Sequence, residues 1–197
     1  METNAAEFCG TLAGAPRFSH TSRGGDFFVF PLETHRLSGT ADTVNVTASR
    51  ALLAGAEVTE GSRIRVLGEV RSFNNRSGVG SKLVISVYAQ RIEFTDDPDL
   101  NRVILRGTLC KPPNLRRTPM GREICDLMLA VNRRCGRSDY LPCIAWGAGA
   151  VMASLWDVGT ETGVDGRLQS RSYVKLTDGV SVEKTAFEIS VSSFFEV

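Results

Sequence analysis

The sequence predicts an all-β protein of two tandem five-stranded barrels, each with one short helix between its third and fourth strands. Three observations predict this fold class. The second half of the chain repeats the first half, with order and spacing kept. Each half is a series of short runs rich in β-branched and aromatic residues, bounded by Gly, Pro, Asn and Asp, which is the pattern of strands and turns. Each half also contains one stretch rich in Ala and Leu that ends shortly before a Gly, which predicts a helix.

The repeat is visible at both ends of the two halves. The residues CGTL at 9–12 recur as RGTL at 106–109, and ISV at 85–87 recurs as ISV at 189–191. Because the order is kept throughout, the pattern indicates duplication of a whole domain, and two copies are too few for a solenoid.

The domain boundary is expected in an acidic, turn-rich segment between apolar strands. We therefore expect one domain at 1–95, a linker at 96–100 and a second domain at 101–197. The acidic cluster of this segment is interpreted as a solvated linker, because no Gly-punctuated calcium-loop pattern surrounds it.

The second half shows each element in order. Its five strands and one helix are expected at 103–105, 124–131, 140–146, 148–156 (the helix), 163–173 and 186–197. The first half has its helix at 49–58, before Gly61. Three strands, a helix and two strands is the order of the five-stranded OB barrel.

Composition sets outer limits on function. Hydrophobic residues make up 42% and charged residues 23%, and the net charge is +1. No apolar run reaches the length of a membrane span, and residues 1–7 lack the apolar core of a secretory signal, so we expect a cytoplasmic protein. The five cysteines form no CxxC pair and there are two histidines, so no metal, cofactor or disulfide framework is expected.

Positive charge gathers in one window of the second half. Between residues 102 and 137 only Glu123 and Asp126 oppose the following cations: Arg102, Arg106, Lys111, Arg116, Arg117, Arg122, Arg133, Arg134 and Arg137. A solvated surface strip and a nucleic-acid footprint both fit such a window.

Three aromatic residues accompany these cations. Tyr140 and Trp146 are six residues apart on one expected strand, so they share a face. Tyr173 ends the next long strand and shares a face with Gln169 and Arg171. Proteins that hold single strands combine cations for phosphates with flat side chains on which bases stack. The alternative is core packing, and the residue pattern alone leaves their orientation open.

At these residues the second half resembles the bacterial single-stranded DNA-binding protein family. The resemblance rests on the runs at 101–107, 113–121, 129–134 and 166–173. It implies that bases stack on Tyr140, Trp146 and Tyr173, and that Cys135 departs from a fourth aromatic position. The expected DNA-binding cations are Arg116, Arg117, Arg122, Arg133, Arg134, Arg167 and Arg171.

The resemblance also sets expectations for partners. The family carries a tail with an acidic tip, whereas this chain stops at Val197, so recruitment of partners through a tail is not expected. Family members form assemblies of four barrels, so a homodimer of this chain is expected, associated with the nucleoid. The role implied is sequence-independent binding of single-stranded DNA in replication, recombination or repair, and RNA stays an open alternative.

The first half departs further from the family. The residue matching Trp146 is taken as Ala48 and the one matching Tyr140 as Asp42. We expect a mainly structural role with residual binding, for which the weaker candidates are Arg17, Arg71, Phe73 and Arg76.

Two other classes of function are weighed. No P-loop, nucleophile elbow or HExxH motif is present, so an enzyme is not expected. The main rival is an accessory module that acts on a replication or primosomal protein mainly through protein contacts. Exposure of Tyr140, Trp146 and Tyr173 would favour DNA binding, and burial would favour the rival.

Overall fold

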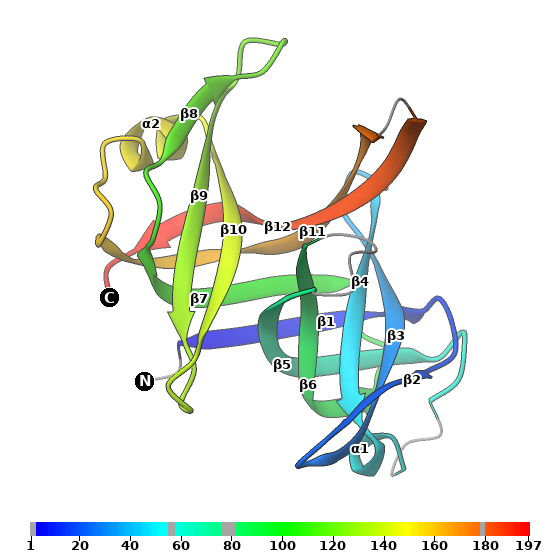
Figure 1. The fold of residues 1–197 in the computed structure, drawn as a ribbon. Helices are drawn as coiled ribbons and strands as arrows, with labels where there is room; N and C mark the ends of the chain where they lie inside the picture. The colour runs from blue at the N-terminus through cyan, green and yellow to red at the C-terminus, as the bar shows by residue number, and fades with distance from the viewer. Residues whose placement is uncertain (1–2, 55–57, 76–81, 178–179) are drawn as a thin grey trace. The chain divides into compact units, whose positions relative to one another are not determined.

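The computed structural model describes the chain except for residues 1–2, 55–57, 76–81 and 178–179 (Figure 1). In the two last strands it gives the backbone but not the side chains of several positions, which are residues 172–173, 175–177, 180 and 182–184.

The chain divides into two compact units. The N-terminal unit comprises Asn4–Arg71 and Ser86–Val103. The C-terminal unit comprises Met1–Thr3, Ser72–Ile85 and Ile104–Val197. A short stretch in the middle of the chain therefore groups with the unit that holds the second repeat. The predicted division at 1–95, 96–100 and 101–197 is a division of the sequence and stays a prediction.

The first repeat forms six strands and one short helix. In order these are β1 (Asn4–Leu12), β2 (Arg17–Ser22), β3 (Gly25–His35), β4 (Ala41–Ser49), α1 (Arg50–Ala54), β5 (Arg63–Asn74) and β6 (Leu83–Phe94). β1 pairs antiparallel with both β3 and β5, and β4 runs parallel to β6, which curls the sheet into a barrel. Phe8, Phe30 and Leu32 are fully buried inside it.

The second repeat has the same order of elements. They are β7 (Leu100–Leu109), β8 (Asn114–Arg117), β9 (Glu123–Asn132), β10 (Ser138–Trp146), α2 (Ala148–Ala153), β11 (Glu161–Thr177) and β12 (Val180–Phe195). β9 pairs with β7, β8 and β10, while β12 pairs parallel with β10 and antiparallel with β11. Leu105, Leu129 and Leu168 are fully buried in its core.

The predicted all-β class with two short helices is confirmed. Each barrel has one strand more than predicted, because β2 and β8 form short hairpin arms with β3 and β9. Every residue of these two arms is exposed, so they lack the apolar alternation that announces a half-buried strand. The helices are shorter than predicted: α2 ends at Ala153 rather than residue 156, and α1 ends at Ala54, just before residues outside the described part. Neither helix of the described chain has the length and apolar character needed to cross a membrane.

The glycine of the repeated CGTL and RGTL segments has a structural reason. A Cβ on Gly10 would lie 2.2 Å from the carbonyl oxygen of Glu33, and one on Gly107 would lie 2.8 Å from that of Ala130. Both distances are too short for a side chain, so glycine lets β1 and β7 meet β3 and β9 closely.

The strand registers correct the alignment of the two repeats by one residue. Asp42 lies opposite Thr34 on β3, and Asp139 lies opposite Val131 on β9. Asp42 therefore matches Asp139 rather than Tyr140, and the match for Trp146 is Ser49 rather than Ala48. The hairpin loops that precede β4 and β10 have the same length, and the one-residue difference between the repeats lies after these strands, before β5 and β11. Placing it one strand too early reverses the face assigned to every side chain.

Candidate nucleic-acid interface

β10 separates a buried face from an exposed face. Leu141, Cys143 and Ala145 are buried, whereas Tyr140 is 51% exposed and Trp146 is 41% exposed. This alternation places the two aromatic side chains outside the barrel. The orientation that the residue pattern left open is therefore outward for both.

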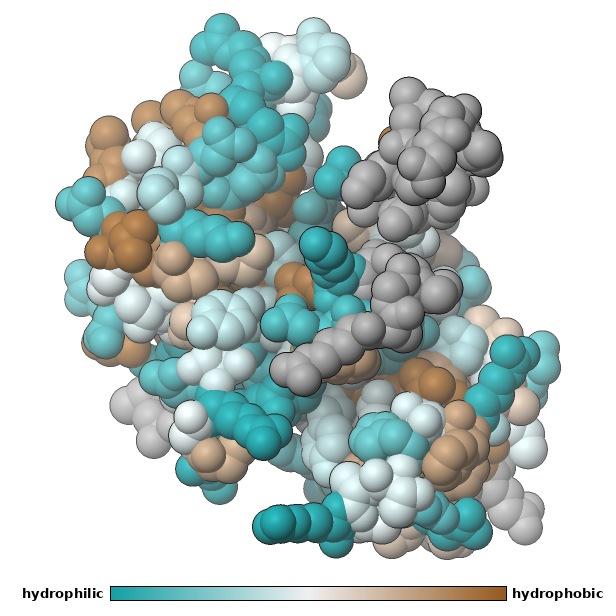
Figure 2. All heavy atoms as spheres, in the orientation of Figure 1, coloured by the Kyte–Doolittle hydropathy of each residue, from teal (hydrophilic) through white to brown (hydrophobic). Residues whose placement is uncertain are grey.

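The neighbouring strands carry polar side chains on this outward face. Trp146 lies opposite Ile124 on β9, and Ile124 lies opposite Arg116 on β8. One residue row along, Asp126 joins the same face. Directly paired residues share a face, so Arg116, Asp126 and Trp146 belong to one surface. Figure 2 shows hydrophilic side chains over the β8–β9 hairpin, and hydrophobic ones over α2.

Arg116 and Asp126 form a two-pronged ion pair within this surface. The Nε of Arg116 donates to one carboxylate oxygen at 2.6 Å, and its second guanidinium nitrogen donates to the other oxygen at 2.9 Å. This contact holds the pKa of Asp126 below its ordinary value, and the positive charge of Arg171 acts in the same direction. Asp126 is thus ionised at neutral pH, and a carboxylate lies among the cations of the face.

Three further cations lie on β8 or in the turns that flank β9, and all three are exposed. Arg117 donates to Glu123 at 2.9 Å, and both side chains reach solvent. Arg122 and Arg134 are exposed in the two hairpin turns that flank β9.

β11 adds a row of alternating polar residues. Leu168 is fully buried, whereas Arg167 and Arg171 on either side of it reach the surface. Gln169 donates to Glu188 at 2.9 Å and accepts from Arg167 at 3.3 Å. The backbone of Tyr173 pairs with Lys184, but its side chain lies outside the described residues, so its predicted stacking role stays a prediction.

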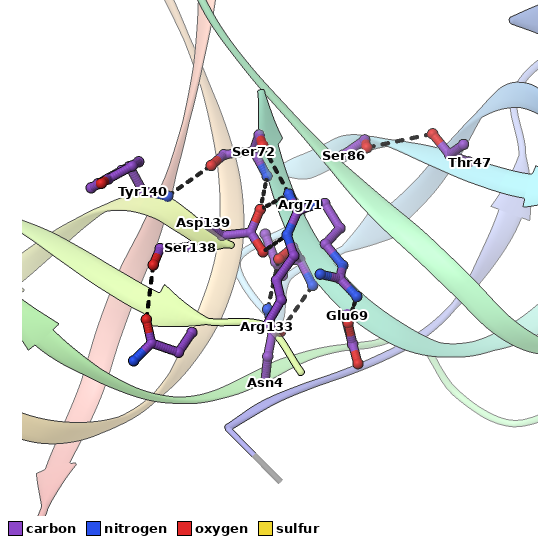
Figure 3. A network of polar contacts seen from close by, with 12 residues as sticks. Asn4, Thr47, Glu69, Arg71, Ser72, Ser86, Arg133, Ser138, Asp139 and Tyr140 are labelled. Atoms are coloured by element: carbon purple, nitrogen blue, oxygen red, sulfur yellow. Dashed lines mark hydrogen bonds and ion pairs between the residues drawn. The ribbon is translucent and has the colours of Figure 1, made fainter. Parts of the chain in front are cut away.

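Arg133 occupies a different environment from the other cations. Its side chain is 22% exposed and pairs with Asp139, whose side chain is completely buried. Figure 3 shows this pair together with Ser72, whose N–H donates to Asp139 at 2.6 Å and whose carbonyl accepts from Arg133 at 3.1 Å. The guanidinium of Arg133 is therefore engaged within the protein fold.

Ser72 and Asp139 are not among the residues predicted from the sequence, although a signal for Asp139 exists. Arg36 and Asp42 in the first repeat have the same spacing as Arg133 and Asp139 in the second, and both pairs form a buried ion pair. The same Arg–Asp spacing of six residues occurs in both repeats, and this shared spacing could have identified Asp139.

The outward face of the first barrel is filled by its own aromatic side chains. His20 stacks on Phe27 at 5.2 Å between ring centroids, Phe27 contacts Tyr88 at 5.7 Å, and Arg71 lies 5.8 Å above the ring of Tyr88. Phe27 is nearly buried as a result. Aromatic residues are thus present on this face, but they stack on one another.

The four weaker candidates of the first repeat are dispersed. Arg17 is exposed on β2, and Arg71 forms an ion pair with Glu69. Phe73 is 55% exposed and belongs to the C-terminal unit. Arg76 lies outside the described residues.

Comparison with known proteins points to one family. Residues 100–195 match the model of the single-strand binding protein family. The chain is 43% identical over 81 residues to single-stranded DNA-binding protein A of Bacillus subtilis, and the match covers 38% of this chain and 47% of that protein. It is 36% identical over 104 residues to single-stranded DNA-binding protein 2 of Listeria innocua, covering 49% of this chain and 65% of that protein. These matches therefore span about half to two thirds of the curated relatives.

A likeness in structure extends over both repeats. The crystal structure of the wild-type single-stranded DNA binding protein from Thermus aquaticus matches with a TM-score of 0.78 and 26% identity. The match covers 98% of this chain and 92% of that one.

Proposed function

Because residues 100–195 match the model of the single-strand binding protein family, we propose that the chain belongs to this family and binds single-stranded DNA without reading its sequence. Such binding would protect exposed strands in replication, recombination or repair. The observation that carries the proposal is the outward orientation of Tyr140 and Trp146 beside Arg116. Exposed aromatic side chains can stack on bases, and neighbouring cations can bind phosphates. An accessory module that acts through protein contacts does not require this combination.

The residues divide into two roles. Tyr140 and Trp146, with Tyr173, stack on bases. The phosphates are held by the surface cations, which are Arg116, Arg117, Arg122, Arg134, Arg167 and Arg171. Arg133 supports the hairpin that carries Tyr140, because its guanidinium is engaged by Asp139.

The first barrel serves mainly as a structural partner. Its outward aromatic residues are stacked among themselves, so fewer faces remain for bases. Arg17 and Phe73 are its exposed candidates for residual contacts, with Arg71 and Arg76 as further ones.

The working assembly is a homodimer that supplies four barrels, in the cytoplasm at the nucleoid. It binds rather than catalyses, and RNA is a second ligand of the same chemistry. Light scattering with and without oligo-dT would test the assembly: a molar mass of two chains supports it, and a single chain in both states contradicts it.

A fluorescence titration with oligo-dT tests the proposed activity. Stacking on Trp146 should quench its emission, while Trp156 packs edge-on against Phe194 at 4.8 Å and should respond little. A Trp156→Phe variant isolates the signal of Trp146. We expect quenching by oligo-dT and much less by a duplex of equal length, with affinity falling as salt rises. Absence of both quenching and retention of oligo-dT at low salt would reject the proposal.

A further inference from the structure

The backbone of Tyr140 is held by a residue from the first repeat of the sequence. β12 pairs with β10 at Cys143 and Ile144, toward the far end of the strand from Tyr140. On the near end, the N–H of Tyr140 donates to the hydroxyl of Ser72 at 2.8 Å. Ser72 is part of the same compact unit as β10, and it supplies the partner that a neighbouring strand would otherwise provide.

Ser72 is itself held in place by a buried ion pair. Its N–H donates to Asp139 at 2.6 Å, and its carbonyl accepts from Arg133 at 3.1 Å (Figure 3). Ser72 and Asp139 are both buried, and a charge without solvent requires such hydrogen bonds. All three polar groups of Ser72 are therefore used, and each one is used on the segment Arg133–Tyr140.

The exposed side chain of Tyr140 contrasts with this buried backbone. Tyr140 is 51% exposed, so its side chain is not enclosed by the protein core. Its position depends on the strand that carries it, and Ser72 fastens that strand directly at the Tyr140 amide. Pre-ordering of a binding group reduces the entropy lost when the ligand binds.

We propose that Ser72 is a positioning residue for base stacking on Tyr140, which makes the first repeat a contributor to binding by the second. The inference rests on the proposed single-stranded DNA binding. Ser72 touches no base in this scheme. It fixes the amide of Tyr140, and the Arg133–Asp139 pair fixes Ser72.

A double-mutant cycle on oligo-dT affinity tests the inference in the full-length chain. Ser72→Ala should weaken binding about fivefold, the size expected for one lost buried hydrogen bond. In a Tyr140→Ala background the same substitution should cost nothing further, because the group it positions is absent. In a Trp146→Ala background it should cost the full amount.

Two additional variants guard against a general loss of structure. Ser138→Ala removes a hydroxyl two residues from Tyr140 that donates to Asn132 instead, so its affinity should equal that of the wild type. Ser72→Cys keeps the side-chain volume but is a weak acceptor, and it should repeat the loss if Ser72→Ala fails to fold. Melting temperatures identify the folded variants.

The outcomes separate the inference from the proposed function. An equal loss from Ser72→Ala in the wild-type and Tyr140→Ala backgrounds would show a general structural role and overturn the inference alone. Unchanged affinity of folded Ser72→Ala or Ser72→Cys would overturn it too. A wild-type chain that fails to bind oligo-dT would instead reject the proposed function, and the positioning role with it.

Discussion

At the scale of single residues, a cation that could bind a phosphate is already bound to a carboxylate of the protein. Arg116 faces the same surface as Trp146, yet both prongs of its guanidinium are bound to Asp126. A phosphate that binds Arg116 must displace this carboxylate or share the guanidinium with it. We therefore expect Asp126 to weaken the proposed DNA binding while it orders Arg116 in the unbound protein.

We predict that Asp126→Asn strengthens binding of oligo-dT at low salt. Removal of the carboxylate leaves Arg116 to neutralise a phosphate, so the slope of log K against log salt should steepen by about 0.7 for one added contact. Titrations at several salt concentrations measure this slope. Glu60→Gln, which removes one exposed charge in the first repeat, is the matched control, and a slope equal to that of the wild type would contradict the prediction.

Trp146→Ala should weaken binding of oligo-dT by about 1–3 kcal/mol, the usual cost of losing one stacked base. The side chain is 41% exposed, so its removal should change the melting temperature little. Equilibrium titration and thermal unfolding measure the two effects. If the folded variant binds as tightly as the wild type, Trp146 is not a stacking residue.

At the scale of elements, the segment between β6 and β7 is fastened to the first barrel. Residues 96–98 are exposed, as expected of a solvated linker, but side chains of that barrel also hold the segment. Asp99 accepts from Arg63 at 2.7 Å and from the ring of His35 at 2.9 Å, and Arg63 also donates to the carbonyl of Asp97 at 3.1 Å. Composition indicated an acidic turn-rich segment, but the side chains that hold it, from Arg63 and His35, lie 34 or more residues away in sequence.

The contacts of Asp99 with Arg63 and His35 predict a pH-dependent effect of Asp99→Asn on stability. Burial raises the pKa of Asp99, but the hydrogen bonds from His35 and Arg63 outweigh it and hold the pKa below 3.8. A lowered pKa in the folded state gives stability above the unfolded value, and this stability is lost as pH falls through the folded value. Asp99→Asn should therefore lower the melting temperature at neutral pH.

In acid the difference between variant and wild type should shrink toward zero, since Asp99 is then protonated in both states. Melting curves from pH 7 downward check this, with Asp96→Asn, a neighbouring exposed carboxylate, as the control. If the difference in melting temperature stayed constant into acid, the stabilising role of the ionised Asp99 carboxylate would be rejected.

At the scale of the whole molecule, two barrels of one fold differ in what their outward faces offer. The face of the second barrel exposes Tyr140 and Trp146, whereas that of the first is occupied by the stack of His20, Phe27 and Tyr88. The two repeats share one barrel fold, but their outward side chains differ. Aromatic side chains are exposed on the second barrel and contact one another on the first.

This asymmetry predicts that the first barrel cannot compensate for the second. A variant with both Tyr140→Ala and Trp146→Ala should lose at least about thirtyfold in affinity for oligo-dT, from two stacked bases at the low end of their usual cost. A His20→Ala variant, altered on the first barrel alone, should bind nearly as tightly as the wild type. Equal losses in the two variants would show that the barrels share the binding.

The sequence by itself determined the duplication, the all-β class and the resemblance of the second half to the single-stranded DNA-binding protein family. Each of these follows from local composition or from order along the chain, such as the repeated Gly10 and Gly107 segments. The candidate site could be predicted in part from the sequence, since the two-residue period of a strand placed Tyr140 and Trp146 on one face.

Only the tertiary structure decided which face is inside. A period of two separates two faces but assigns neither to the core, because that depends on how the sheet closes. Closure buried Leu141 and exposed Tyr140, and folding brought Ser72 to the Tyr140 amide from 68 residues away. A contact between residues so distant in sequence forms only in the folded chain, so no local pattern predicts it.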